Sequence, residues 1–136
     1  MKNLKQKQEG LTFLGLCIIL GFIAIVVLFV LRAFPLYNEK FQVNAAINSV
    51  ASRPDAESLK DSDVIKYFMH NIQVTNIERF TDNNVKDHVE VIKPTKRGGD
   101  KLMHVHYEAR NILFGDLYLV LVFDRKVPLK GGGTGE

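Results

Sequence analysis

Cysteine is nearly absent from this chain, since Cys17 is the only one among 136 residues. A single thiol excludes an internal disulfide. The chain also has no basic stripe, because the formal net charge of +3 comes mainly from Lys2, Lys5 and Lys7 at the N-terminus. Nucleic-acid binding, which needs a clustered basic surface, is therefore disfavoured. The segment around Gly98 lacks the spacing of a P-loop and predicts a hairpin turn instead of a phosphate site.

Patterns for nucleophilic catalysis are missing as well. Cys17 lies inside an apolar run, where a thiol is expected to be unreactive. No serine is accompanied by an evident base. The sequence therefore predicts a protein that is not an enzyme and that uses no cofactor.

What the chain does have is one long apolar run. Residues 11–31 contain no charged side chain. As a helix with a rise of 1.5 Å per residue, the run would be about 30 Å long, the thickness of the hydrocarbon core of a bilayer. A signal peptide has a shorter apolar core and ends at small residues, whereas Arg32 to Pro35 make a poor cleavage site. We expect a retained transmembrane helix over residues 11–31.

The charges that flank this run predict its orientation. Three lysines precede it, and Arg32 alone follows it directly. The positive-inside rule then makes residues 1–10 a cytoplasmic basic tail and places residues 32–126 outside, in the periplasm of a Gram-negative cell. We expect residues 127–136, which end in GGGTGE, to form a flexible tail. The predicted location is the inner membrane, crossed once.

Apolar spacing after the run predicts that the helix continues into the domain. We expect one helix over residues 10–51, kinked near Pro35 because proline lacks a backbone donor. Beyond the kink, one face is apolar at intervals of three and four residues. This face consists of Leu36, Val43, Ala46, Ile47 and Val50. A second, short helix is expected over residues 62–71, with Ser62 or Asp61 as its cap.

Three later segments are predicted to be strands: the first two alternate between polar and apolar residues, and the third is apolar on both faces. They cover residues 85–93, 102–110 and 117–124. Gly98-Gly99 marks one hairpin and Gly115-Asp116 marks another. The sequence thus predicts an α+β, pilin-like fold with a long N-terminal helix, a short second helix and a three-stranded antiparallel meander.

Two apolar features are candidate partner-binding surfaces. Tyr118, Val120 and Val122 occupy the face of the last strand where a half-solvated sheet should be polar. Either another element covers them or they form an exposed patch that binds a partner. Within the membrane run, a stripe of mostly small residues would let another helix approach closely, unless the spacing is ordinary variation in a lone anchor. This stripe consists of Cys17, Gly21, Ala24 and Leu28.

A pair of histidines raises the question of a metal site. His104 and His106 point to one face of a strand, and His88 and Glu90 of the neighbouring strand could join them. Zinc sites need three or four convergent ligands with supporting contacts. We favour a solvated polar face on which the histidines pair with Glu90. A histidine-based metal enzyme is the third functional hypothesis.

The start of the chain resembles the leader of a type IV pilin. Residues 7–15, KQEGLTFLG, combine a basic segment, a glycine, an apolar-threonine-apolar start and a long apolar helix. The resemblance implies cleavage after Gly10, with Leu11 as the new N-terminus. Gly15 stands where major pilins carry glutamate, a residue that aids assembly.

Over residues 8–125 the chain resembles a family of short proteobacterial single-pass membrane proteins catalogued as a domain of unknown function. The resemblance is carried by short motifs: Gly10-Leu11-Thr12-Phe13, Pro35-Leu36-Tyr37, Tyr107-Glu108-Ala109-Arg110, Gly115-Asp116-Leu117 and Phe123-Asp124. Genes of this family often neighbour the gene for signal peptidase I. The resemblance therefore implies signal peptidase I as a membrane partner.

Together these observations predict a non-catalytic accessory or scaffold protein, anchored in the inner membrane, that binds a membrane-protein partner. The alternative is a minor pilin or pseudopilin, a subunit of a type IV pilus or of a type II secretion-like assembly. In both cases the chain contacts the lipid bilayer, and self-association is open.

Overall fold

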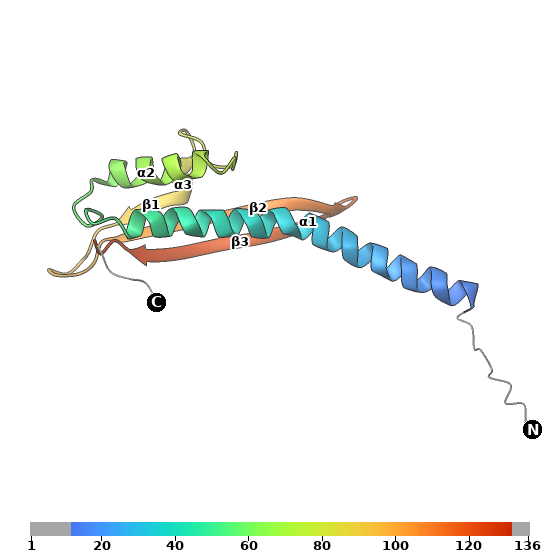
Figure 1. Ribbon diagram of the computed structural model, residues 1–136. Helices are drawn as coiled ribbons and strands as arrows, with labels where there is room; N and C mark the ends of the chain where they lie inside the picture. The colour runs from blue at the N-terminus through green and yellow to red at the C-terminus, as the bar shows by residue number, and fades with distance from the viewer. Residues whose placement is uncertain (1–11, 132–136) are drawn as a thin grey trace, which may run out of the picture.

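The computed structural model describes residues 12–131. Its longest element is helix α1 (Phe13–Ala51). Figure 1 shows that its N-terminal half projects away from the rest of the molecule and that its C-terminal half lies along the sheet. The helix runs through Pro35 without interruption and bends near its middle. A proline removes one backbone hydrogen bond and crowds the preceding turn, which explains the bend. The prediction of one long helix is confirmed.

The two halves of α1 have different surroundings. The five residues assigned above to its apolar face, from Leu36 to Val50, are all buried in the domain. In the projecting half, the apolar residues are exposed, and this stretch is long and apolar enough to cross a membrane. The predicted cytoplasmic tail (residues 1–10) and the pilin-like cleavage point between Gly10 and Leu11 lie outside the described residues.

Helix α2 (Asp61–Gln73) confirms the predicted second helix. Its face toward the core carries Val64, Phe68 and Ile72, all buried. The expected cap at Ser62 or Asp61 is wrong, since the helix is capped by Lys60 without a side-chain hydrogen bond. The reason is that the Asp61 carboxylate already binds two ammonium groups, those of Lys101 at 2.9 Å and Lys93 at 3.3 Å.

Three strands, β1 (Val89–Ile92), β2 (Leu102–Phe114) and β3 (Leu117–Pro128), form the predicted antiparallel meander, in the order β1-β2-β3. The expected first strand over residues 85–93 is too long, because its start is a helical turn, α3 (Val85–His88). Asn84 explains the difference: its side chain accepts from the Thr81 N–H and donates to the Arg79 carbonyl, so the turn continues into a helix.

The last two strands extend further than their alternation predicted. They are joined by the two-residue turn Gly115-Asp116, in which Gly115 has a φ of 52°. The expected flexible tail over residues 127–136 starts too early, because Val127 and Pro128 belong to β3 and Leu129 is buried. The Leu129 N–H donates to the Lys101 carbonyl at 2.7 Å, which holds this end against the sheet. Residues 132–136 lie outside the described part.

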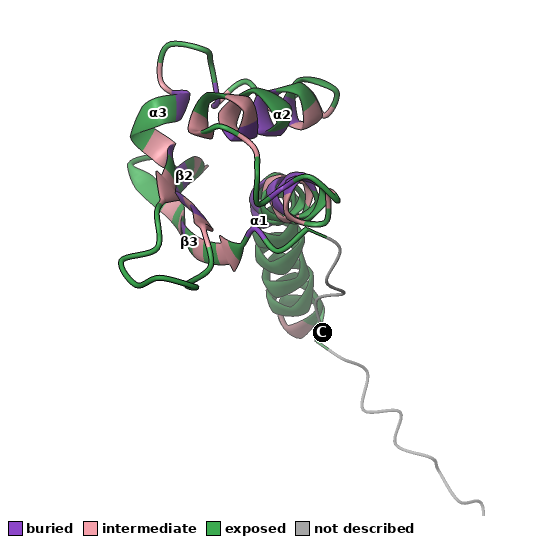
Figure 2. Cartoon of the chain, turned by 90° about the vertical axis from the view of Figure 1, so that its left-hand side faces the viewer, coloured by how far each residue is buried: buried purple, intermediate pink, exposed green. Residues whose placement is uncertain are grey.

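The core lies between the sheet and the helices. Figure 2 looks along α1 and shows β2 and β3 to one side of it and α2 above. Phe68 of α2 meets Phe80 edge-on, Phe80 meets Tyr107 edge-on, and Tyr107 stacks on Phe123, with ring centroids 5.0–5.4 Å apart. This chain of aromatic rings joins α2, β2 and β3 into one α+β domain.

Candidate functional site

The sheet has a packed inner face and an open outer face. On β3, Tyr118, Val120 and Val122 point outward and are 55%, 48% and 70% exposed. No element among residues 12–131 covers them. Of the two alternatives open at the level of sequence, the structure therefore favours the exposed patch. We call these three side chains the outer face of β3; its binding role stays a prediction.

On the same side of the sheet, the residues of β2 that lie opposite the outer face of β3 change from charged to apolar toward the hairpin. Ile112 lies opposite Tyr118, Arg110 opposite Val120, and Glu108 opposite Val122. The charges of β2 satisfy each other, because the Arg110 guanidinium donates to the Glu108 carboxylate at 3.0 Å. The sheet thus changes from polar near His106 to fully apolar at the hairpin turn.

The small-residue stripe does not join this surface. Cys17, Gly21, Ala24 and Leu28 are all exposed on the projecting half of α1. A Cβ added at Gly21 would meet no atom within 4 Å, so the stripe is open to a second helix. The two predicted binding surfaces are therefore separate, one on the apolar half of α1 and one on the sheet.

A third apolar surface was not recognised from the sequence. Phe34, Tyr37 and Phe41 are exposed on α1 just beyond the apolar run. Their spacing of three and four places them on one side of the helix, away from the buried Val43 and Ile47. The same periodicity that identified the buried face could have revealed this aromatic stripe.

The histidines do not form a metal centre within the described residues, where no group of three metal-binding side chains comes together. His104 Nε2 lies 2.9 Å from Asp124 Oδ1, so the expected pairing with Glu90 is wrong. Although Glu90 stands opposite His104 in register, β3 offers the imidazole a closer carboxylate. His88 leaves the strand for the end of α3, where its Nδ1 is 3.2 Å from the His106 carbonyl oxygen.

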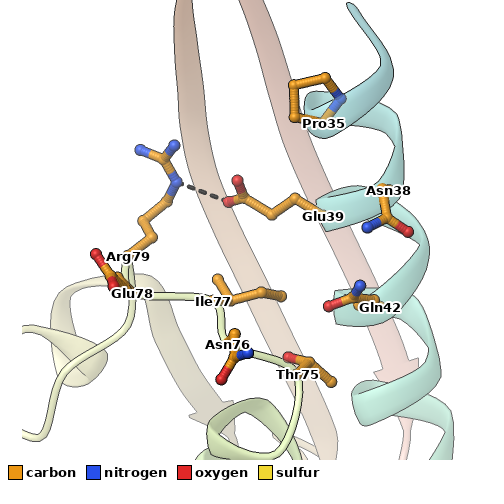
Figure 3. A pocket seen from close by; sticks show the side chains of 9 residues that line it. All are labelled: Pro35, Asn38, Glu39, Gln42, Thr75, Asn76, Ile77, Glu78 and Arg79. Atoms are coloured by element: carbon orange, nitrogen blue, oxygen red, sulfur yellow. Dashed lines mark hydrogen bonds and ion pairs between the residues drawn. The ribbon is translucent and has the colours of Figure 1, made fainter.

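A pocket lies between α1 and the segment that follows α2. Pro35, Asn38, Glu39 and Gln42 line one side, and residues 75–79 line the other. Figure 3 shows Glu39 and Arg79 pointing toward each other across it. Arg79 Nε donates to Glu39 Oε1 at 2.7 Å, and Arg79 Nη1 donates to the Glu108 carbonyl at 3.2 Å. One side chain thus ties α1, the pocket segment and β2 together.

Two buried polar atoms lie in this region without a partner among the described residues, Gln42 Oε1 and the Tyr107 hydroxyl. Burial raises the pKa of the Tyr107 phenol, the negative charge of Glu39 adds to the rise, and Arg79 opposes it. The pocket lining therefore offers the Gln42 amide, the ion-paired Glu39 carboxylate and the Glu78 carboxylate. The protonated Tyr107 phenol lies close enough to Glu39 and Arg79 to feel their charges. These groups can accept and donate hydrogen bonds.

A family model described as Domain of unknown function (DUF4845) matches residues 32–123. The chain belongs to this family. The match starts at Arg32, directly after the apolar run, and ends at Phe123 within β3. It therefore covers most of the domain and leaves the projecting half of α1 and the end of β3 outside. It confirms the resemblance to a family of unknown function. No curated protein and no solved structure matches the chain.

The unpaired hydroxyl predicts the response of the DUF4845 domain to Tyr107→Phe. Removing a buried, unsatisfied hydroxyl should raise the free energy of unfolding by about 1 kcal/mol. Because the folded-state pKa is raised, the wild type should also lose stability above about pH 10, where the unfolded chain ionises its tyrosine first. The variant should lack that part of the alkaline loss. Urea unfolding at neutral and alkaline pH, followed by circular dichroism, measures both effects; destabilisation at neutral pH would contradict the prediction.

Proposed function

We propose that this chain is a non-catalytic, single-pass inner-membrane protein whose DUF4845 domain lies in the periplasm and binds a membrane-protein partner as an accessory or scaffold subunit. The observation that carries the proposal is the outer face of β3. Tyr118, Val120 and Val122 form an apolar row in water on a sheet whose other face is already packed. A row of this kind on a soluble surface is typical of a protein–protein contact.

The continuity of α1 supports the membrane part of the proposal. The apolar half and the domain half are one helix, so an inserted N-terminal half would hold the sheet close to the bilayer. The partner is then a protein of the same membrane. Signal peptidase I, which the family resemblance implies, is the first one to test. The open stripe around Gly21 provides a second contact inside the bilayer.

Two substitutions test the outer face without disturbing the sheet. Val120→Glu faces Arg110 and Val122→Lys faces Glu108, so each new charge has an opposite charge across the strand, and the net charge is unchanged. The double variant should fold normally. It should bind the partner at least about tenfold more weakly, because both charges must lose water in the interface. Co-purification of full-length protein with signal peptidase I in mild detergent measures the effect.

Val74→Glu is the control, since Val74 is an exposed valine, 76% exposed, that lies in the segment after α2, away from the sheet. It should leave binding unchanged. Equal recovery of signal peptidase I with the wild type and the double variant would show that the outer face is not the contact. Failure of the wild type to recover it at all would reject this partner.

A second candidate function, a minor pilin or pseudopilin subunit, is supported by a different observation. The apolar half of α1 projects while its other half packs on an antiparallel sheet, an arrangement similar to that of a pilin (Figure 1). Filament subunits could associate through the projecting halves. Mass spectrometry of the mature N-terminus separates the two functions: a methylated Leu11 favours the filament subunit, and an intact N-terminal segment favours the accessory protein.

A further inference from the structure

We infer that the tip of the β2–β3 hairpin is a second membrane contact, seated in the lipid headgroup layer beside the point where α1 leaves the bilayer. The hairpin tip consists of Ile112, Phe114 and Leu117. The inference rests on the membrane anchoring in the proposed function, but not on any protein partner.

A hydrogen bond fixes the hairpin next to the end of the apolar run. Asn111 Nδ2 donates to the Arg32 carbonyl at 2.9 Å, and Arg32 is the first residue after the run. The strand continues beyond Asn111 to Phe114. Figure 1 shows the hairpin turn beside the bend of α1, at the end of the sheet from which the helix projects. If residues 11–31 span the bilayer, the tip lies at its surface.

The chemistry of the tip suits this position. Ile112, Phe114 and Leu117 are 47%, 77% and 60% exposed, which is costly in water at about 25 cal/mol for each Å² of apolar surface. Phe34 and Tyr37 are exposed on the adjacent turns of α1. Tyrosine is enriched where membrane meets water, and Phe and Leu form the apolar face of segments that are seated in this interface. Exposed apolar side chains thus lie near the end of the apolar run both on the sheet side, at the hairpin tip, and on the opposite side of α1, at the start of the aromatic stripe.

The two ends of the sheet differ in the way a membrane would require. The loop at the far end, between β1 and β2, carries Lys96, Arg97 and Asp100, all exposed. The hairpin end instead carries the apolar side chains Ile112, Phe114 and Leu117, with Asp116 as the one charged residue among residues 112–117. This difference between the two ends of the sheet is expected if the hairpin end faces a membrane and the far loop faces water.

Asp116 limits the depth of insertion. Its carboxylate lies in the turn and stays hydrated only in the headgroup layer. The bend of α1 is consistent with shallow seating, because the hairpin diverges from the projecting half and does not run alongside it (Figure 1). A second contact of this kind would stop the domain from rotating about α1 and would fix the direction in which the outer face of β3 points.

Tryptophan fluorescence tests the contact, since the chain contains no tryptophan. Phe114→Trp places a single reporter at the tip. The full-length variant is reconstituted in phosphatidylcholine–phosphatidylglycerol vesicles whose acyl chains carry bromine, a quencher, near the headgroup end or near the methyl end. Two matched variants frame the result: Phe22→Trp in the middle of the apolar run, and Lys96→Trp in the far loop.

We expect headgroup-end bromine to quench Phe114→Trp strongly and methyl-end bromine to quench it weakly. Phe22→Trp should show the opposite order, and Lys96→Trp should be quenched by neither. If Phe22→Trp is quenched while Phe114→Trp behaves like Lys96→Trp, the hairpin contact is overturned and the anchor stands. If Phe22→Trp is also unquenched, the membrane anchoring itself is rejected, and the contact with it.

Discussion

Phe68→Ala should lower the free energy of unfolding by about 3–5 kcal/mol, the cost of removing a buried aromatic ring and leaving a cavity. Phe68 is fully buried and begins the chain of rings that runs through Phe80 and Tyr107 to Phe123. A domain of roughly 100 residues has about 5–15 kcal/mol of stability in total. Loss of this ring therefore leaves α2 poorly attached, and the domain should unfold at much lower urea concentration.

Phe41→Ala provides the control, because it is the same chemical change at an exposed position of α1. It should alter stability by no more than about 0.5 kcal/mol. Both variants are measured by urea unfolding of full-length protein in detergent, followed by near-ultraviolet circular dichroism of Tyr107 and its aromatic neighbours. Similar midpoints for the two variants would mean that α2 does not pack on the core as described.

Leu129→Ala should cost about 2–5 kcal/mol, although Leu129 lies close to the end of the chain. Its side chain is 1% exposed, and its N–H is bound to Lys101 next to the start of β2. The residue therefore closes the core at the end of the sheet away from the projecting half of α1. The same urea experiment measures the loss.

Leu117→Ala is the matched control, since Leu117 is an exposed leucine at the start of β3, the strand that ends just before Leu129. It should change stability by about 0.5 kcal/mol or less in detergent. If Leu129→Ala were equally mild, the end of the chain would behave as the flexible tail that the glycine-rich sequence predicted.

Features that depend on local periodicity could be predicted well. Val43 and Ile47 repeat at helical spacing, and Met103, Val105 and Tyr107 alternate as in a strand; all five are buried as expected. Periodicity alone fixes which side of an element is apolar. The packed face then has to meet whatever other apolar face the chain provides, which here leads to one meander under one helix.

Features that depend on contacts between distant residues could not be predicted. Arg79 reaches Glu39, which is 40 positions away, and Leu129 returns to Lys101. His104 pairs with Asp124 of β3 and not with Glu90 of β1, although Glu90 stands opposite it in register. Each of these choices depends on three-dimensional placement, about which local sequence patterns say nothing.

The candidate site could be predicted only in part, because its exposure also depends on three-dimensional placement. Alternation marked Tyr118, Val120 and Val122 as anomalous, but only the fold shows that nothing among the described residues lies over them. The exposure of Phe34 and Phe41 could not be predicted, because it depends on which side of α1 the sheet covers. Their exposure became evident once the sheet occupied the opposite side of the helix.

Because α1 is unbroken, it fixes the distance between its apolar half and the far end of the domain. From Arg32 to Ala51 the helix rises about 1.5 Å per residue, or roughly 30 Å, with no hinge loop between its apolar half and the domain. A domain on a flexible linker can occupy many positions relative to its anchor, whereas this domain is held in one position by the continuous helix α1. With the apolar half of α1 in the bilayer, as proposed, only partners whose own contact surface lies within that distance of the membrane would reach the sheet. Any tilt of the apolar half would be transmitted directly to the sheet.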